Sequence, residues 1–384
     1  MIEKPDAFHV VGIEFNSHGI KIAKLSMRRG QPCLEYCDEI ACELHAYAQS
    51  EHLLKRAVHS ETLKSVLTRS LIVTSLNTNE VLVRPLEVKL KKDADIDEVL
   101  AFQAEPLLPY PVEQALVDRI RLSETPEGTL LTLFAVRKDH LRQHLSLVHQ
   151  GDIEPEVITA HPMALAAFAQ FFSASDKTYY VVHLGELQTT CILMREGKLV
   201  AAQACFQGMT LLKEAYEKEG CRLGVSFADI DISQLSQKQD PLVWEALEQF
   251  RLEIKRTLYA LAKSLKGQEI DYLLFTGEGA SQMHFPEYLC QPLNKPLVTP
   301  SVHAHFDLPI AQLQKWAIPI GAALTALPHK KEQINFRQQE FAYPHPWKRY
   351  KKPVMVYLGL CVVLAIAFYL MGIAYVHYQK DQLR

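Results

Sequence analysis

Three glycine-bearing turns stand far apart in the sequence, and each carries residues of the kind that hold a phosphate group. They are "GIEFNSHGIK" at 12–21, "HLGELQTT" at 183–190 and "FTGEGAS" at 275–281. The backbone N–H groups of such turns can bind phosphate oxygens. The three turns therefore indicate either a protein that grips and splits a nucleotide or one that has kept only the shape of such a site.

The turns lie between segments whose patterns predict strands. Residues 8–28 alternate as two strands around a turn, and residues 179–203 form a second pair of strands. Further strands are predicted at 71–76 and 81–88, and a strand within 271–282 runs into the third turn and the start of a helix.

Helices are predicted between these strands, and the alternation of the two indicates an α/β chain. The longest covers 243–266, where apolar side chains recur at steps of three and four residues and form one stripe. Shorter helices are predicted at 93–105, 208–220 and 316–327, and segments with a strand followed by a helix at 130–152 and 155–172.

The composition is that of a globular protein and narrows the choice of partners. The 384 residues suit two or three domains of roughly 150 residues each. The net charge of −3 excludes nucleic acid as the main partner, because a phosphate-binding surface usually shows a basic excess. The eight cysteines include no CxxC pair and no metal-ligand spacing, which predicts free thiols in a reducing compartment and no metal site.

The C-terminal segment has the composition of a membrane span. An uncharged run of about 23 residues, where a bilayer core needs about 20, extends from Val354 to Val376. It follows the basic, aromatic stretch "WKRYKK" at 347–352, and the N-terminus lacks the layout of a signal peptide. The positive-inside rule then predicts one pass, with the N-terminal domains in the cytoplasm and a short tail outside.

The most specific stretch is "EVLAFQAEPLLPYPVEQALVDRIRL" at 98–122, a helix followed by Glu105, Pro109, Tyr110 and Pro111 and then a strand. With "GDIEPEVITAHPMALA" further on, it resembles the type IV pilus assembly protein family PilM and its relatives FtsA and GspL, over residues 8–328. The resemblance implies an actin-like ATPase fold, which is a duplicated ribonuclease H-like α/β fold, with an inserted α+β subdomain. The C-terminal transmembrane helix is added to it.

The resemblance also implies a domain plan. A first actin-like domain covers 1–178 and carries the inserted subdomain at about 84–158, and a second covers 179–329. A polar and basic linker at 330–352, the transmembrane helix at 353–377 and a tail at 378–384 follow.

The first turn keeps part of the family's Asp-x-Gly-Ser/Thr pattern. Glu14 and Asn16 replace the aspartate and the glycine, while Ser17 and Lys21 match. Asparagine is the usual second choice for a left-handed backbone, so the turn survives. Glu14 keeps a carboxylate for indirect contact with a metal but is one methylene longer.

The second turn departs further. Gly185, Thr189 and Thr190 match the family, but His183 replaces an aspartate that would orient Mg²⁺ or the attacking water, and Glu186 replaces a small residue. A neutral imidazole is a poor Mg²⁺ ligand. We expect His183 to be a packed histidine at a strand end; its alternative role is that of a general base.

The third turn keeps Gly277 and Gly279 of a Gly-Gly-Gly pattern but places Glu278 between them, where an adenosine phosphate would lie. In the family, the counterparts of Glu253 and Arg256 face the ribose and base; the alternative is a solvated helix face. These changes predict that hydrolysis is lost: no catalytic residue is assigned and no cofactor is required, although weak binding of ATP and Mg²⁺ is left open.

The linker carries a second motif. In type IV pilus systems PilM binds the cytoplasmic tail of a membrane partner, PilN, through an Ile-Asn-Leu-Leu-Pro type motif. Ile334, Asn335 and Phe336 resemble its start, and they predict a PilN-like segment fused to its own receptor. A covalent tether would raise its effective concentration to roughly millimolar. The alternative is a polar linker without this role.

Two functions from different classes follow. The first is a pseudo-ATPase scaffold of a type IV pilus or type II secretion platform at the inner membrane. Its partners would be PilN/PilO-like membrane proteins, membrane lipid around the terminal helix and possible second copies of the chain, with no nucleic acid. The alternative is an active ATP-binding ATPase or switch of the FtsA type, a class that attaches through an amphipathic helix rather than a full span.

Overall fold

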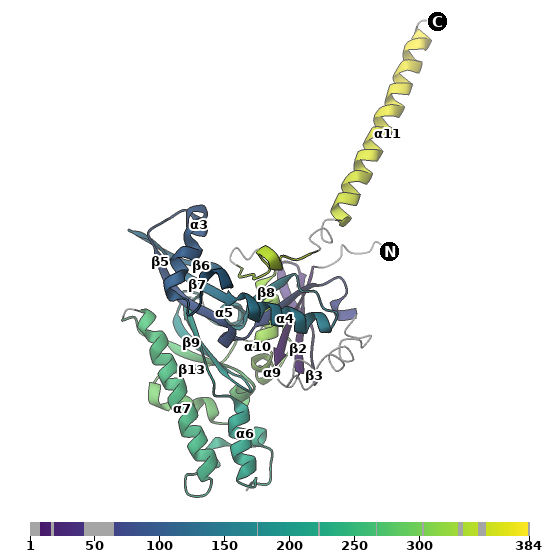
Figure 1. Cartoon of the computed structure of the whole chain (residues 1–384). Coiled ribbons are helices and arrows are strands. Elements are labelled where there is room, and N and C mark those ends of the chain that lie inside the picture. The colour runs from purple at the N-terminus through teal and green to yellow at the C-terminus, as the bar shows by residue number, and fades with distance from the viewer. Residues whose placement is uncertain are drawn as a thin grey trace. The chain divides into compact units, whose positions relative to one another are not determined.

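The computed structural model describes residues 8–16, 19–41, 65–174, 176–221, 223–265, 267–301, 303–328, 333–344 and 351–382 (Figure 1). The chain divides into two compact units, residues 1–338 and 339–384. The first unit holds all the strands of the described residues, and the second holds a long helix.

The first sheet has the strand order β3-β2-β1-β4-β8. The first three strands run antiparallel, and β4 and β8 run parallel to β1. Its strands are β1 (His9–Asn16), β2 (Gly19–Arg28), β3 (Gln31–Ala41), β4 (Leu71–Leu76) and β8 (Val157–Ala160).

The second sheet repeats this arrangement in the order β11-β10-β9-β12-β13. Again three antiparallel strands are followed by two parallel ones. Its strands are β9 (Thr178–Leu184), β10 (Thr189–Arg195), β11 (Lys198–Cys205), β12 (Tyr272–Gly277) and β13 (Leu297–Val298). The repeated order is the one expected of a duplicated ribonuclease H-like fold.

A third, smaller sheet forms the inserted part. Its order is β5-β7-β6, made of β5 (Val81–Val88), β6 (Ala115–Thr125) and β7 (Gly128–Arg137), all antiparallel. Helix α3 (Asp93–Ala104) lies against it and buries Ile96 and Leu100 on Leu131 and Leu133. On the outer side of α3, Phe102 is a large apolar residue that is 72% exposed.

Helices cover both faces of the first sheet, which is why β1 is buried along most of its length. Val11 and Ile13 pack on Val148 of α4 (Lys138–Gln150). Gly12 points the other way, because side chains alternate along a strand. A Cβ there would collide with Pro319 of α10 (Ala317–Thr325).

Helices α10 and α5 (His161–Phe172) are rich in small side chains and pack closely together. A Cβ on Gly321 of α10 would collide with the carbonyl of Ala164 on α5. Close packing of these two helices holds the β1 side of the molecule next to β10 and β11, which α5 also contacts.

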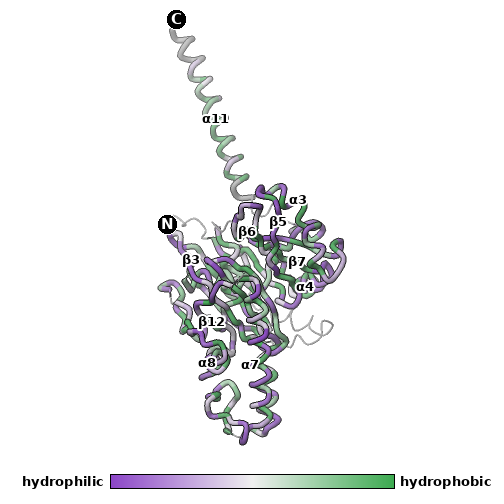
Figure 2. The backbone as a smooth tube through the Cα atoms, turned by 90° about the vertical axis from the view of Figure 1, so that its left-hand side faces the viewer, coloured by the Kyte–Doolittle hydropathy of each residue, from purple (hydrophilic) through white to green (hydrophobic). Residues whose placement is uncertain are grey.

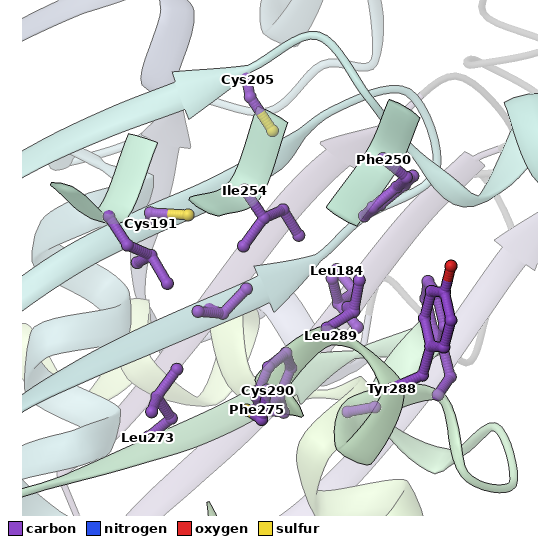
Figure 3. Close-up of a cluster of buried hydrophobic side chains, with 14 of the residues drawn as sticks. Leu184, Cys191, Cys205, Phe250, Ile254, Leu273, Phe275, Tyr288, Leu289 and Cys290 are labelled. Carbon is purple, nitrogen blue, oxygen red and sulfur yellow. The ribbon is translucent and has the colours of Figure 1, made fainter. Parts of the chain in front are cut away.

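The second sheet has its own core, formed with α6 (Met209–Lys218) and α7 (Pro241–Ala262). Phe250 and Ile254 of α7 lie over Cys191 and Leu184, and Leu273 and Phe275 of β12 complete the cluster (Figure 3). This unit also contains α8 (Phe285–Cys290), α9 (Ile310–Lys315) and short 3-10 turns that include Glu278–Ser281.

The second unit contains α11 (Lys351–Gln382). Its stretch Val354–Tyr375 has 22 residues and a mean hydropathy of 2.6, which is long and apolar enough to cross a membrane. Figure 2 colours this helix mostly green to pale. Residues 345–350, which include most of the basic stretch before the predicted span, lie outside the described residues.

The structure agrees with most predicted elements and differs at three places. β3 was not predicted, because much of this edge strand is half-exposed and lacks a clear alternation of apolar and polar residues. The predicted helix start after the third turn is only a 3-10 turn. Residues 333–338 of the predicted linker belong to the first compact unit. The predicted domain boundaries remain a prediction.

Candidate functional site

A cavity of about 460 Å³ lies at the turns of the two hairpins, between the two five-stranded sheets. Of the residues predicted to bind a nucleotide, Glu14, Asn16, Gly185 and Thr190 line it. Ser17 lies outside the described residues. The other predicted residues, Lys21, Thr189, Glu253, Arg256, Gly277 and Gly279, are not among the described wall residues.

Lys21, the cation of the first hairpin, forms an ion pair within the protein. Its ammonium lies 3.0 Å from the carboxylate of Glu278, the residue inserted in the third turn. Lys315 of α9 also approaches Glu278 at 3.6 Å and contacts Glu39 of β3 at 2.7 Å. Burial alone would raise the pKa of Glu278, but Lys21 and Lys315 hold it below its ordinary value. Of the two cations that offset Glu278, Lys21 thus comes from the end of the first turn and Lys315 from α9.

Glu14 faces Lys21 across the β1–β2 ladder and is 5% exposed. Burial raises the pKa of its carboxyl to about 7, and the carboxylates of Glu278, Glu186 and Glu39 add to this, whereas Lys21 opposes it. Lys21 forms its ion pair with Glu278 rather than with Glu14. Of the two carboxyls near this lysine, Glu14 is therefore the one that takes up a proton at neutral pH.

The threonines of the second turn also make internal contacts. The hydroxyl of Thr190 bonds that of Thr78 at 2.7 Å, which ties β10 to the 3-10 turn before β5. The hydroxyl of Thr189 donates to the Gln207 carbonyl at 2.8 Å. The sequence predicted both hydroxyls as phosphate ligands. In the structure, both make hydrogen bonds within the protein instead.

The second turn itself caps helix α6. The Met209 N–H donates to the Gly185 carbonyl and the Thr210 N–H to the Glu186 carbonyl, each at 3.0 Å. The first N–H groups of a helix are otherwise free to bind an anion. Here the carbonyls of the turn satisfy two of them.

The two glycines of the third turn make room for protein atoms. Gly277 has a φ of 88°, and a Cβ there would collide with the Leu184 carbonyl. A Cβ on Gly279 would lie 2.5 Å from the Met209 sulfur and 2.9 Å from the Leu184 Cβ. Glycine is required at both positions because strand β9 and helix α6 approach so closely.

Three buried histidines stand around the cavity. His183 bonds Thr276 at 3.1 Å and His144 bonds Thr74 at 2.9 Å, which agrees with a packed role for His183. Burial lowers the pKa of His144 to about 4 and that of His161 to about 3, and it lowers the pKa of His183 well below its ordinary value. All three imidazoles are neutral at pH 7.

Glu253 and Arg256 of α7 lie apart from the cavity. They pair with each other at 2.6 Å, and their side chains are 38% and 65% exposed. The observed pairing fits the alternative interpretation of these residues, a solvated helix face.

A second candidate site is formed by residues 333–338, which contact β6 and β8. Ile334 and Phe336 are fully buried, as alternate side chains of an extended segment can be. The Phe336 N–H donates to the Ile158 carbonyl at 2.8 Å, along the outer edge of β8. An edge strand exposes unpaired backbone groups, and this segment covers some of them.

Asn335 makes four hydrogen bonds, two to strands β8 and β6 and two within the segment itself. Its side-chain oxygen accepts from the N–H groups of Ile158 and Arg337, at 3.1 and 3.0 Å. Its own N–H donates to Asp118 at 3.1 Å, and its carbonyl accepts from the Gln338 side chain at 2.7 Å. The Gln338 amide also donates to Asp118, and Arg337 pairs with Glu154. We call Asp118, Glu154 and Ile158 the docking surface.

Several of these residues escaped the sequence reasoning. His144 and His161 gave no signal because each sits on a helix far from the three turns in sequence. Asp118 belongs to a stretch that resembles the PilM family, but nothing in its spacing linked it to Asn335, 217 residues away. The one sequence signal for Lys315 was indirect: the negative charge of Glu278 in the third turn calls for a cation nearby.

Comparisons with known proteins agree with this architecture. The sequence model of the family described as type IV pilus assembly protein PilM matches residues 12–312, most of the chain. A solved PilM-PilN type IV pilus biogenesis complex is 19% identical, with a TM-score of 0.63, and the match covers 82% of this chain and 97% of that one. The actin-like fold predicted from the sequence is thereby confirmed.

A second solved structure is the cytoplasmic domain of EpsL, an inner membrane component of the type II secretion system of Vibrio cholerae. It is 11% identical with a TM-score of 0.42, and the match covers 87% of this chain and 99% of that one. No curated protein sequence matches the chain.

Proposed function

Because the chain belongs to the PilM family of type IV pilus assembly proteins, we propose that it is a non-enzymatic scaffold of a type IV pilus or type II secretion platform. α11 anchors it in the inner membrane, and its partners are PilN-like membrane proteins. The observation that carries the non-enzymatic part is the ion pair of Lys21 with Glu278 at 3.0 Å.

A nucleotide would have to break this ion pair before Lys21 could meet a phosphate. It would also bring its negative charge next to Glu278, Glu14 and Glu186. Two unit charges 4 Å apart interact by about 4 kcal/mol at an effective dielectric of about 20. Close packing at the glycines of the third turn opposes nucleotide binding sterically. The threonine hydroxyls of the second turn oppose it because they already make hydrogen bonds within the protein.

The scaffold part of the proposal is supported by the docking surface. A segment that resembles the PilN motif lies on β6 and β8 of the same chain, where Asn335 makes one hydrogen bond to Asp118 and one to Ile158. We propose that this segment is the chain's own PilN-like motif. Residues 339–350 lie between this segment and α11 in the sequence.

Calorimetry of the full chain in detergent micelles, titrated with Mg-ATP, tests the non-enzymatic part. The wild type should show no binding at micromolar concentrations and release no phosphate. Glu278→Gln frees Lys21 from its partner and should bind Mg-ATP more tightly than the wild type. Micromolar binding by the wild type, together with phosphate release, would overturn the proposal in favour of an active ATPase.

Membrane anchoring is tested by extraction of membranes with alkaline carbonate. A spanning protein stays in the pellet, whereas a peripheral one is released. Recovery of the full chain in the supernatant would contradict anchoring by α11.

A further inference from the structure

The wall of the cavity between the two sheets carries carboxyl groups, whereas a phosphate site carries cations. Its wall holds three carboxyl groups, those of Glu14, Glu80 and Glu186, and three imidazoles that are neutral at pH 7. Within the described part of the chain, no lysine or arginine belongs to the wall. Phosphate sites carry such cations, so the wall is built to repel an anion and attract a cation.

Three wall residues also have buried polar atoms that lack a hydrogen-bond partner among the described residues. They are Glu14 Oε2, Ser75 Oγ and His161 Nε2. Their side chains come from β1, β4 and α5, and each residue is at most 5% exposed. Buried polar atoms are nearly always satisfied in folded proteins, so three such residues around one cavity point to a bound group that satisfies them.

The charged groups around Glu14 show which charge the site lacks. Lys21 is the positive group that acts on its carboxyl, against the carboxylates of Glu278, Glu186 and Glu39. Lys21 is itself paired with Glu278, which Lys315 also contacts, and His161 and His183 contribute no charge at neutral pH. Burial is the main cause that raises the pKa of the Glu14 carboxyl to about 7, and a cation bound beside the carboxylate would lower that pKa again.

We propose that this cavity binds a small organic cation with a primary ammonium group. An ammonium group has three N–H donors and no acceptor. Glu14 Oε2, Ser75 Oγ and His161 Nε2 can all accept, the last when the imidazole carries its proton on Nδ1. The volume of about 460 Å³ has room for a molecule of several heavy atoms. Mg²⁺ fits less well, because it prefers oxygen ligands in a strict octahedron and three imidazoles stand in the wall.

This inference rests on the proposed loss of nucleotide binding, since a triphosphate would need the same space. It goes beyond that loss, because it assigns the cavity a ligand of the opposite charge. Binding would replace the proton on Glu14 with the ammonium charge. Uptake of the amine therefore releases protons near neutral pH, about half a proton per amine at pH 7 if the pKa is near 7.

Calorimetry of the full chain in detergent micelles, with 1,4-diaminobutane as the probe, tests this. Titrations at pH 7 in two buffers of different ionisation enthalpy give both the affinity and the number of protons released. The wild type should bind with one site and release protons. Glu14→Gln should weaken binding at least 10-fold and abolish the proton release, whereas Glu113→Gln, an exposed carboxyl outside the cavity wall, should change neither.

Two results would overturn the inference: no binding of the amine by the wild type at millimolar concentrations, or equal binding by wild type and Glu14→Gln. Thermal unfolding of both proteins without amine shows that the variant is folded. Mg-ATP titrated into the same samples separates this inference from the proposed function. Binding of Mg-ATP without binding of the amine would refute both, whereas absence of binding by either ligand would refute only the amine.

Discussion

The cavity between the sheets and the docking surface on β6 and β8 use polar residues in opposite ways. Beside the cavity, Lys21 and Glu278 pair with each other, and in its wall buried polar atoms of Glu14, Ser75 and His161 lack partners among the described residues. On the docking surface, Ile334 and Phe336 are fully buried, and Asn335 between them makes four hydrogen bonds.

The difference indicates which of the two places holds a segment of the protein itself. A satisfied polar residue between buried apolar side chains is the usual composition of a specific protein contact. A cleft whose cation is held by its own carboxylate has lost the electrostatic complementarity that a phosphate needs. The docking surface, by contrast, holds a segment of the protein by several hydrogen bonds.

The largest effect is expected from Phe336→Ala, which removes the fully buried ring from the docked segment. Truncation of a buried phenylalanine costs about 3–5 kcal/mol, so the segment should detach from β8. Hydrogen exchange of the Ile158 amide, which donates to Asn335, measures this. Phe206→Ala, at a ring that is 77% exposed, is the control and should leave this exchange unchanged. Equal protection in Phe336→Ala and wild type would mean that the docking contact contributes little.

The next effect concerns the neutral histidines of the cavity. The pKa of His161 is about 3 in the fold and 6.5 when unfolded, so the unfolded chain takes up the extra proton as the pH falls below 6.5. Stability is therefore lost between about pH 6.5 and 3, by about 2 kcal/mol between pH 7.5 and pH 5.

Urea unfolding of the full chain in detergent at these two pH values measures this loss. His161→Gln should lose about 2 kcal/mol less than the wild type on acidification. The exposed His305, changed to glutamine, should behave as the wild type does. If His161→Gln keeps the full acid dependence, then His161 is not a buried neutral group.

A smaller effect is expected at Asp118, which accepts hydrogen bonds from the Asn335 N–H and the Gln338 amide. A double-mutant cycle of Asp118→Ala and Gln338→Ala should give a coupling of about 1 kcal/mol. The readout is again the exchange of the Ile158 amide. Asp95→Ala, on the exposed side of α3, should show no coupling to Gln338. A coupling near zero for Asp118 would remove it from the docking surface.

The smallest effect is expected from Arg256→Ala. The pair of Arg256 with Glu253 is largely exposed, and such pairs contribute less than about 0.5 kcal/mol. Neither the urea midpoint nor the binding of Mg-ATP or an amine should change. A marked effect on ligand binding would instead place α7 at the binding site.

Much of the fold could be predicted because it depends on local patterns. The strands at 71–76 and 81–88 appear at the predicted residues, since short runs rich in branched and apolar side chains are typical of strands. The helix predicted at 93–105 ends one residue earlier, at Ala104. The pattern did not predict strand β3, because at this sheet edge residues of both faces are partly exposed and apolar and polar residues do not alternate clearly.

The site was harder to predict, because side chains far apart in the sequence decide it. The sequence indicated that Glu278 stands in a phosphate turn, but not that Lys21 and Lys315 would hold it. It marked Asn335, but not Asp118 or Ile158 as its partners.

The sequence by itself determined the order of strands and helices, the apolar C-terminal helix and the departures from the family's nucleotide-binding pattern in the three turns. These features depend on neighbouring residues and on residue type. Only the tertiary structure decided what those residues do. Packing of α5 on α10 and of the third turn on β9 and α6 brings Lys21 to Glu278 and closes the space over Gly279. A pairing between groups 257 residues apart depends on how the sheets pack, and no local pattern encodes it.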